Sequence, residues 1–176
     1  MYSTARRWVK LTVTYYNMHS LITDRTEVDV LRWRRLRDKG YAAMTADEKA
    51  EWDSGMMKGA YNTSDLNRVG AALNYVRDRL IDASYLPVNA FTAKTDWNVS
   101  GLPTEADLTY YLNCVRQVRE AMAQFATTPP TPEDTGALDY NEANNIEKIL
   151  IDVDILISNM LAGRYFCGEL YSGEVD

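Results

Sequence analysis

A hydrophobic pattern occurs three times along this chain of 176 residues. In each copy, five apolar residues follow one another at alternating spacings of three and four, which places them on one face of an α-helix. Such a face stabilises a protein only when it is buried, so we expect a mainly α fold with a three-helix bundle core and heptad-like stripes. The predicted core residues are Leu66, Val69, Leu73, Val76, Leu80, Leu108, Tyr111, Val115, Val118, Met122, Ile146, Ile149, Val153, Leu156 and Met160.

A predicted helix cap precedes each stripe. Asn62 and Asn141 each follow a tyrosine, and Thr104 with Asp107 has the spacing of a capping box. Oxygen atoms of these side chains can accept hydrogen bonds from the first backbone N–H groups of a helix, which lack partners within it. The caps therefore predict three helix starts independently of the apolar residues.

Two further helices are predicted before the first stripe. One has its start signal in the segment Thr23-Asp24-Arg25-Thr26-Glu27 and ends at Gly40, and its many charged residues indicate a largely exposed helix. The other begins at a capping box, Thr45 with Glu48, and ends at Ser54-Gly55. We thus expect a single helical domain over residues 23–176, preceded by an N-terminal arm or strand over residues 1–22.

Short strands are predicted at both termini. Residues 8–16 are rich in β-branched and aromatic residues and alternate in polarity, which favours a strand, with a helical or extended arm as the alternative. Residues 164–176 contain two Gly-Glu pairs and several aromatic residues, which indicates a strand-like tail. The tail could pair with the N-terminal strand or with a neighbouring subunit.

The connections over residues 81–103 and 126–139 are long for a helical bundle. Each is long enough to return along a helix of about 30 Å, so both parallel and antiparallel helix orders are open. Tyr85, Phe91 and Trp97 in the first connection are expected to pack on the bundle; if exposed, they would mark a partner site.

Charge and composition exclude several classes of partner. The net charge of −6 argues against nucleic acid and against anionic membranes. The basic cluster from Arg32 to Lys39 could form a local positive patch, although a solvated helix face explains it more simply. We expect neither a membrane span nor a signal peptide. Cys114 and Cys167 are expected to be buried thiols in a reducing cytoplasm rather than a disulfide.

No catalytic or metal-binding pattern is apparent. His19 is the single histidine, and we expect it to cap or pack. Asp152 and Asp154 diverge by roughly 200° on a helix, and we expect them, like Glu133 and Asp134, to be solvated. We therefore expect no enzyme, cofactor, metal or small-molecule substrate. The possible partner contacts are Trp33, Trp52 and Trp97.

Several segments carry a resemblance to known proteins. They are Asp24-Arg25-Thr26 with Val28-Asp29-Val30, Met44-Thr45-Ala46-Asp47-Glu48-Lys49-Ala50-Glu51-Trp52, Lys58-Gly59-Ala60-Tyr61-Asn62 with Asp65-Leu66-Asn67-Arg68-Val69, Lys94-Thr95-Asp96-Trp97 with Pro103-Thr104, Ala143-Asn144-Asn145-Ile146-Glu147, and Ser172-Gly173-Glu174. Through them, residues 22–176 resemble virion-associated proteins of tailed phages and prophages of Firmicutes and other gut bacteria, encoded among tail, baseplate and fibre genes. The resemblance implies a structural role and supplies no catalytic residue.

The expected function is that of a non-enzymatic phage structural protein of the tail, baseplate or fibre assembly. It would be made in the bacterial cytoplasm, reside in the virion, and pack against other virion proteins and copies of itself as a homo-oligomer. The alternative is a cytosolic helical adaptor or regulator that binds another protein through its tryptophans. A third, enzymatic hypothesis needs a cleft in which His19 meets carboxylates. The sequence leaves open the neighbour or receptor and the oligomeric state.

Overall fold

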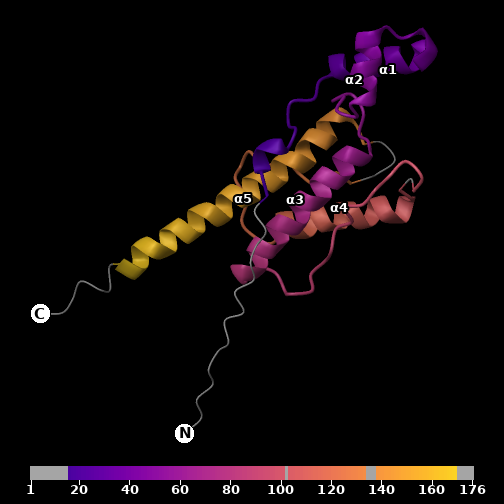
Figure 1. Ribbon diagram of the computed structural model, residues 1–176. Helices are drawn as coiled ribbons and strands as arrows, with labels where there is room; N and C mark the ends of the chain where they lie inside the picture. The colour runs from indigo at the N-terminus through magenta and orange to yellow at the C-terminus, as the bar shows by residue number, and fades with distance from the viewer. Residues whose placement is uncertain (1–15, 102, 134–137, 170–176) are drawn as a thin grey trace, which may run out of the picture.

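The computed structural model describes residues 16–101, 103–133 and 138–169, and the chain is mainly helical, which confirms the predicted class (Figure 1). The described part contains no strand beyond an isolated bridge between Asn98 and Gly101. No described helix is long and apolar enough to cross a membrane. The helices are α1 (Glu27–Lys39), α2 (Ala46–Asp53), α3 (Thr63–Asp82), α4 (Glu105–Glu120) and α5 (Tyr140–Glu169), with short 3-10 helices η1 (Met18–Ser20) and η2 (Tyr41–Ala43).

Most of the helix starts are where the sequence predicts them. Capping boxes begin α1 at Thr26, α2 at Thr45, α3 at Asn62 and α4 at Thr104. The predicted cap of α5 at Asn141 is wrong. The side chain of Asp139 instead accepts from the N–H of Glu142, and the carboxylate of Glu142 accepts from the N–H of Asp139. This reciprocal pair satisfies two N–H groups and starts the helix at Tyr140.

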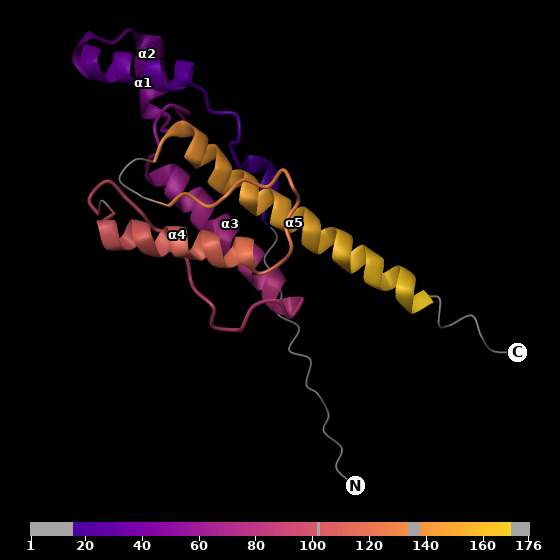
Figure 2. The same ribbon diagram turned by 180° about the vertical axis from the view of Figure 1, so that it is seen from behind.

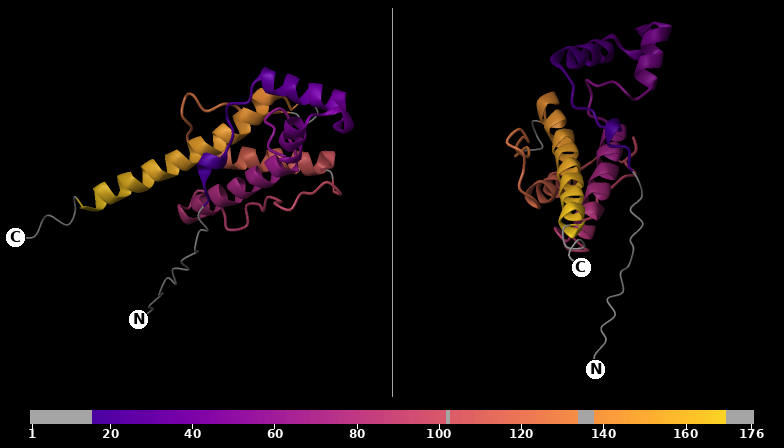
Figure 3. Two further views of the ribbon diagram at one scale, coloured as in Figure 1. Left: turned by 45° about the horizontal axis from the view of Figure 1, so that its top comes forward. Right: turned by 90° about the vertical axis from the view of Figure 1, so that its left-hand side faces the viewer.

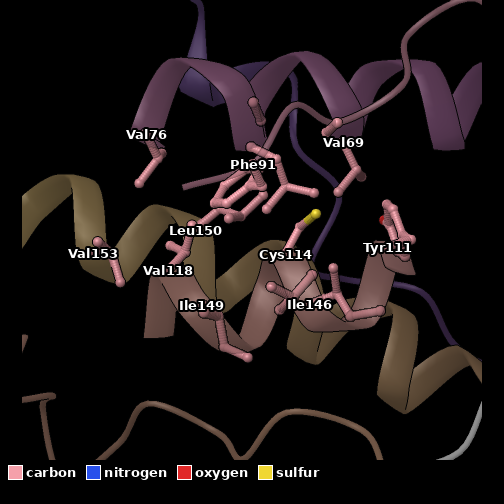
Figure 4. Packing of buried hydrophobic residues seen from close by; sticks show 14 of the residues in the cluster. Val69, Val76, Phe91, Tyr111, Cys114, Val118, Ile146, Ile149, Leu150 and Val153 are labelled. Atoms are coloured by element: carbon pink, nitrogen blue, oxygen red, sulfur yellow. The ribbon is translucent and has the colours of Figure 1, made fainter. Parts of the chain in front are cut away.

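The three long helices pack against one another and enclose the core (Figure 4). Val69 and Val76 of α3 face Cys114 and Val118 of α4 and Ile146 and Ile149 of α5. Phe91 from the first connection lies between the helices. The predicted packing of Phe91 and Trp97 is confirmed, because both are buried, whereas Tyr85 is exposed. The core therefore draws on a connection as well as on the helices.

The first connection returns along α3. The side-chain amide of Asn74 accepts from the N–H of Ala93 and donates to its carbonyl, and Asn67 holds the backbone of Trp97 in the same way. At Gly70 the backbone of Lys94 comes so close that a Cβ would lie 2.3 Å from the Lys94 carbonyl oxygen. Because the chain returns to the start of α3 before α4 begins, α3 and α4 run in the same direction (Figure 2).

The second connection returns along α5 in a similar way. Its Pro129 carbonyl accepts from Nε of Arg119 at the end of α4, and its Thr128 donates to Asp152 in the middle of α5. Along α5, Glu147 meets Arg68 of α3, and Asp154 meets Arg79 further on. All three long helices are therefore parallel, which answers the question that the sequence leaves open.

The segment formed by α1, η2 and α2, residues 27–53, projects from one end of the core, and we call it the headpiece (Figure 3). Leu36 is its buried residue in α1, and that helix is otherwise largely exposed, as predicted. The rings of Trp33 and Trp52 stack with centroids 6.4 Å apart. The stacking of Trp33 on Trp52 thus holds α1 and α2 of the headpiece together.

The strand-like tail predicted for residues 164–176 is wrong over residues 164–169, which continue α5. Residues of good helix propensity such as Met160, Leu161 and Ala162 precede this segment, and extending a formed helix is easier than starting one. The remaining tail, residues 170–176, lies outside the described residues, as do residues 8–15 of the predicted N-terminal strand. Of the predicted arm, Met18–Ser20 forms η1, and Leu21 is buried in the core.

Candidate interaction surfaces

Four charged side chains form a buried cluster where α3 and α5 begin. Nη2 of Arg25 donates to Oδ1 of Asp65 at 2.9 Å and to Oε1 of Glu147 at 2.7 Å. Nη2 of Arg68 donates to the same two oxygens, at 2.5 and 3.0 Å. The side chains of Arg25 and Glu147 are 1% and 0% exposed. Two cations therefore balance two carboxylates inside the protein.

The other oxygens of this charge cluster also have partners. Oε2 of Glu147 accepts from the N–H of Ile22 at 2.6 Å, and Oδ2 of Asp65 accepts from the N–H of Asn62 at 3.0 Å. The Asn144 side chain binds both the N–H and the carbonyl of Arg25. Each carboxylate oxygen of the cluster thus has at least one hydrogen-bond donor, and the described residues contain no cluster suited to a metal. The cluster fastens the segment before α1 to the core.

Two tyrosine hydroxyls form a second polar contact in the core. The hydroxyls of Tyr61 and Tyr111 lie 2.5 Å apart beside a cavity of about 230 Å³ whose other lining residues are apolar. Burial raises the pKa of both hydroxyls, and the nearby carboxylate of Glu147 adds to this effect. The two groups therefore stay neutral and link the start of α3 to α4.

An open cleft of about 670 Å³ separates the headpiece from the start of α5. Its floor is fixed at Gly59, where a Cβ would lie 2.0 Å from the carbonyl oxygen of Asp29. The charged groups of this cleft are mostly engaged: Lys58 binds Asp24, Asp139 caps α5, and Arg25 belongs to the charge cluster. The cleft thus offers a surface for contacts.

The tryptophans predicted as partner contacts lie in two different environments. Trp33 and Trp52 are half-buried in the headpiece, with the guanidinium of Arg37 over the Trp33 ring. Trp97 is only 8% exposed, so its predicted role as a surface contact is wrong. Its backbone is held by Asn67, and Lys94 covers its ring at 4.1 Å. Only the headpiece pair remains available to a partner.

The predicted core residues are not equally buried. All five in α3 are buried, as are Tyr111, Val115, Val118, Ile146, Ile149 and Val153. Leu108, Met122, Leu156 and Met160 are half-buried, and Met122 lies beyond the end of α4. In α5 the fully buried face also includes Leu150 and Ile157, which the predicted stripe does not contain. The buried face of α5 is therefore wider than a stripe with one apolar residue every three or four positions. This is usual for a helix that packs against two neighbouring helices.

The remaining candidate residues are the single histidine, the two cysteines and the acidic pair of the second connection. His19 is exposed in η1, so it is not packed as expected, and its N–H binds the Asn17 side chain. Cys114 is buried, and burial raises the pKa of its thiol to about 11. The side chain of Cys167, like Asp134, lies outside the described set. Glu133 is exposed as expected.

The expectation that Asp152 and Asp154 are solvated is wrong. Asp152 is buried and binds Lys148 and Thr128, whereas Asp154 pairs with Arg79. The second connection and α3 lie on either side of α5, and each covers one of the two carboxylates. The aspartates point to separate partners, in line with their expected divergence.

Exposed apolar side chains occur at both ends of the molecule and in the first connection, where Val88 and Val99 are 81% and 85% exposed. In the headpiece, Val28 and Leu31 of α1 are 73% and 54% exposed. At the other end α5 extends past α3 and α4, and Leu161 there is 36% exposed (Figure 1).

A scan of protein-family models and searches of curated proteins and of solved structures found no match to this chain.

Proposed function

We propose that the protein is a non-enzymatic structural component of a phage virion, in the tail, baseplate or fibre assembly. It would be made in the bacterial cytoplasm and act by packing against other virion proteins and further copies of itself, without binding nucleic acid, membrane or a small-molecule substrate. The sequence resemblance of residues 22–176 to virion-associated proteins motivates the phage assignment. Its core is best described as a parallel three-helix bundle with heptad-like stripes.

The observation that carries the structural role is the contrast between the core and the two ends. The buried charges in the described core are paired with one another, so they serve to hold the helices together. The apolar side chains of Val28 and Leu31 on α1, and of Leu161 on α5, are instead exposed on elements that project from opposite ends (Figure 3). A helical protein with exposed apolar side chains at both ends is suited to bridge two neighbouring proteins.

A cytosolic adaptor is the second candidate. The half-buried pair of Trp33 and Trp52 favours it, because tryptophan is enriched at the centres of protein interfaces. An adaptor would bind its partner through the headpiece and would be absent from finished particles.

The test is mass spectrometry of purified particles from a lysogen that carries the gene, combined with complementation of a deletion strain. We expect the protein in particles at a fixed ratio to the other structural proteins. Complementation by Leu31→Asp should restore few infectious particles, whereas Val99→Asp, at a residue that is 85% exposed near α4, should restore them fully. Normal, infectious particles that lack the protein would reject the structural role and favour the adaptor.

A further inference from the structure

A small cavity lies beside the hydroxyl pair of Tyr61 and Tyr111, and its volume is about 230 Å³. Apart from the two tyrosines, its walls are aliphatic side chains from α3, from α4 and from the ends of both connections, namely Leu66, Pro103, Leu108, Leu112 and Leu138. Pro103, Leu108 and Leu138 are only half-buried, so one side of the cavity lies close to the surface.

The two tyrosine hydroxyls leave one proton without an acceptor. Burial raises the pKa of both groups, so each hydroxyl keeps its proton. The contact of 2.5 Å between the two oxygens uses one O–H as the donor, and neither oxygen has another hydrogen-bond partner within the described part of the chain. Tyr111 is only 7% exposed. Because buried donors are nearly always paired, the second O–H at the cavity wall requires an explanation.

Water alone does not suit this cavity. A buried water typically makes about three hydrogen bonds and occupies about 30 Å³, so several waters would be needed to fill the space. Among the side chains that line it, only the two tyrosines carry a polar group. An apolar cavity of about 150 Å³ stays dry and binds benzene. The aliphatic wall therefore favours a molecule with an apolar ring.

The neighbouring charge cluster limits the polar group that such a molecule can carry. The carboxylate of Glu147 contributes to the raised pKa of both hydroxyls, so its negative potential reaches them. The guanidinium of Arg25 lies 5.4 Å from the centre of the Tyr61 ring, but it is already bound to Asp65 and Glu147. An anionic ligand would lose its hydration here without gaining an unpaired cation. A neutral acceptor avoids this cost and satisfies the second O–H.

We propose that this cavity binds an uncharged ring compound that carries one hydrogen-bond acceptor. The ring would lie among Leu66, Leu108 and Leu112, and the acceptor would receive the O–H that the tyrosine pair leaves unpaired. The proposal concerns binding alone, and it does not depend on the structural role proposed above.

Benzonitrile, toluene and benzoate test the proposal, because they share a ring and differ in the attached group. Each compound is titrated into protein with ¹³C-labelled leucine methyl groups and followed by NMR. We expect benzonitrile and toluene to shift the methyl signals of Leu66, Leu108 and Leu112, and benzoate to bind at least about tenfold more weakly than benzonitrile. The infrared stretching band of the bound nitrile should move to higher frequency, as hydrogen bonding from an O–H group requires.

The double variant Tyr61→Phe with Tyr111→Phe tests the hydrogen bond. Both hydroxyls must be removed, because either can supply the unpaired proton. We expect the affinity for benzonitrile to fall about fivefold, the nitrile band to lose its shift, and the affinity for toluene to stay the same. Tyr110→Phe is the matched control, because the Tyr110 hydroxyl binds the backbone of Thr92 instead, and it should change neither affinity.

Leu108→Trp tests the place of binding without touching the tyrosines. The larger side chain would occupy the cavity from its half-buried side and should abolish the binding of both neutral probes, whereas Leu161→Trp on the projecting end of α5 should not. Leucine methyl signals that do not move with any probe, or binding that survives Leu108→Trp, would overturn the cavity as the site. An unshifted nitrile band, or an unchanged benzonitrile affinity in the double variant, would overturn the role of the hydroxyl pair.

Discussion

Where α3 and α5 begin, four charged side chains are buried together, whereas the ion pairs between α1 and α2 of the headpiece lie at the surface. Arg25 is 1% exposed in its pairs, while Arg32 and Lys39 are 33% and 35% exposed in theirs with Glu51 and Glu48. A buried charge that loses its partner is costly, whereas water replaces a lost partner at the surface. The buried charge cluster therefore fixes how segments distant in sequence meet, and the surface ion pairs of the headpiece add little to stability.

The largest expected effect comes from Arg25→Met. The substitution leaves Asp65 and Glu147 sharing only Arg68, so one buried negative charge is uncompensated. We expect a loss of about 3–5 kcal/mol in the free energy of unfolding. Urea unfolding followed by circular dichroism measures it, with Lys39→Met in the headpiece as the control, whose midpoint should hardly move. Equal effects of the two variants would contradict the contrast between the regions.

A smaller effect is expected from Gly70→Ala. The new Cβ would lie 2.3 Å from the Lys94 carbonyl oxygen, so the returning connection must move away from α3. Overpacking of this kind costs about 1–3 kcal/mol. Gly163→Ala is the matched control, because nothing lies within 4 Å of its Cβ position, and it should be neutral or slightly stabilising. Thermal unfolding of both variants gives the comparison, and an unchanged melting temperature for Gly70→Ala would refute the close approach.

Trp33→Ala should act on the headpiece alone. It removes the stack with Trp52, worth about 0.5–1.5 kcal/mol beyond the buried area, and the contact with Arg37, worth about 0.5–1 kcal/mol. Hydrogen exchange should show faster exchange of the amides in α1 and α2 and unchanged protection in α3 and α5. Loss of protection throughout would mean that the headpiece and the core unfold as one unit.

The smallest effect concerns the pH dependence of the headpiece. The hydrogen bond from Lys39, with that from the Thr45 N–H, lowers the pKa of Glu48 from 4.5 to about 2. Because the folded pKa lies below the ordinary value, this contribution is complete above about pH 4.5 and is lost as the pH falls toward 2. An NMR titration of the Glu48 carboxyl should give a midpoint near 2, and Lys39→Met should move it upward. A midpoint near 4.5 in the unmodified protein would show that the contact is absent in solution.

Local sequence signals predict the elements better than their arrangement. The stripe of α3 and the caps at Asn62 and Thr104 depend on residues a few positions apart, so they can be identified from sequence. The charge cluster joins residues whose separations are 40 and 122 positions, and no periodicity relates them. The burial of Trp97 is likewise not evident from nearby residues, because its backbone is held by Asn67 in α3. Tryptophan occurs both in cores and at partner sites, so the residue type alone does not distinguish a buried Trp97 from an exposed one.

The parallel order of α3, α4 and α5 also affects how the chain folds. In an antiparallel bundle a short turn brings neighbouring helices together at once. Here α4 meets α3 only after the first connection has returned along it, as the contacts of Asn67 and Asn74 show. Contacts between residues distant in sequence slow the search for the native state, because loop closure costs entropy before packing compensates for it. Refolding should therefore be slower than for an up-and-down bundle of similar size, with the connections as late and limiting elements.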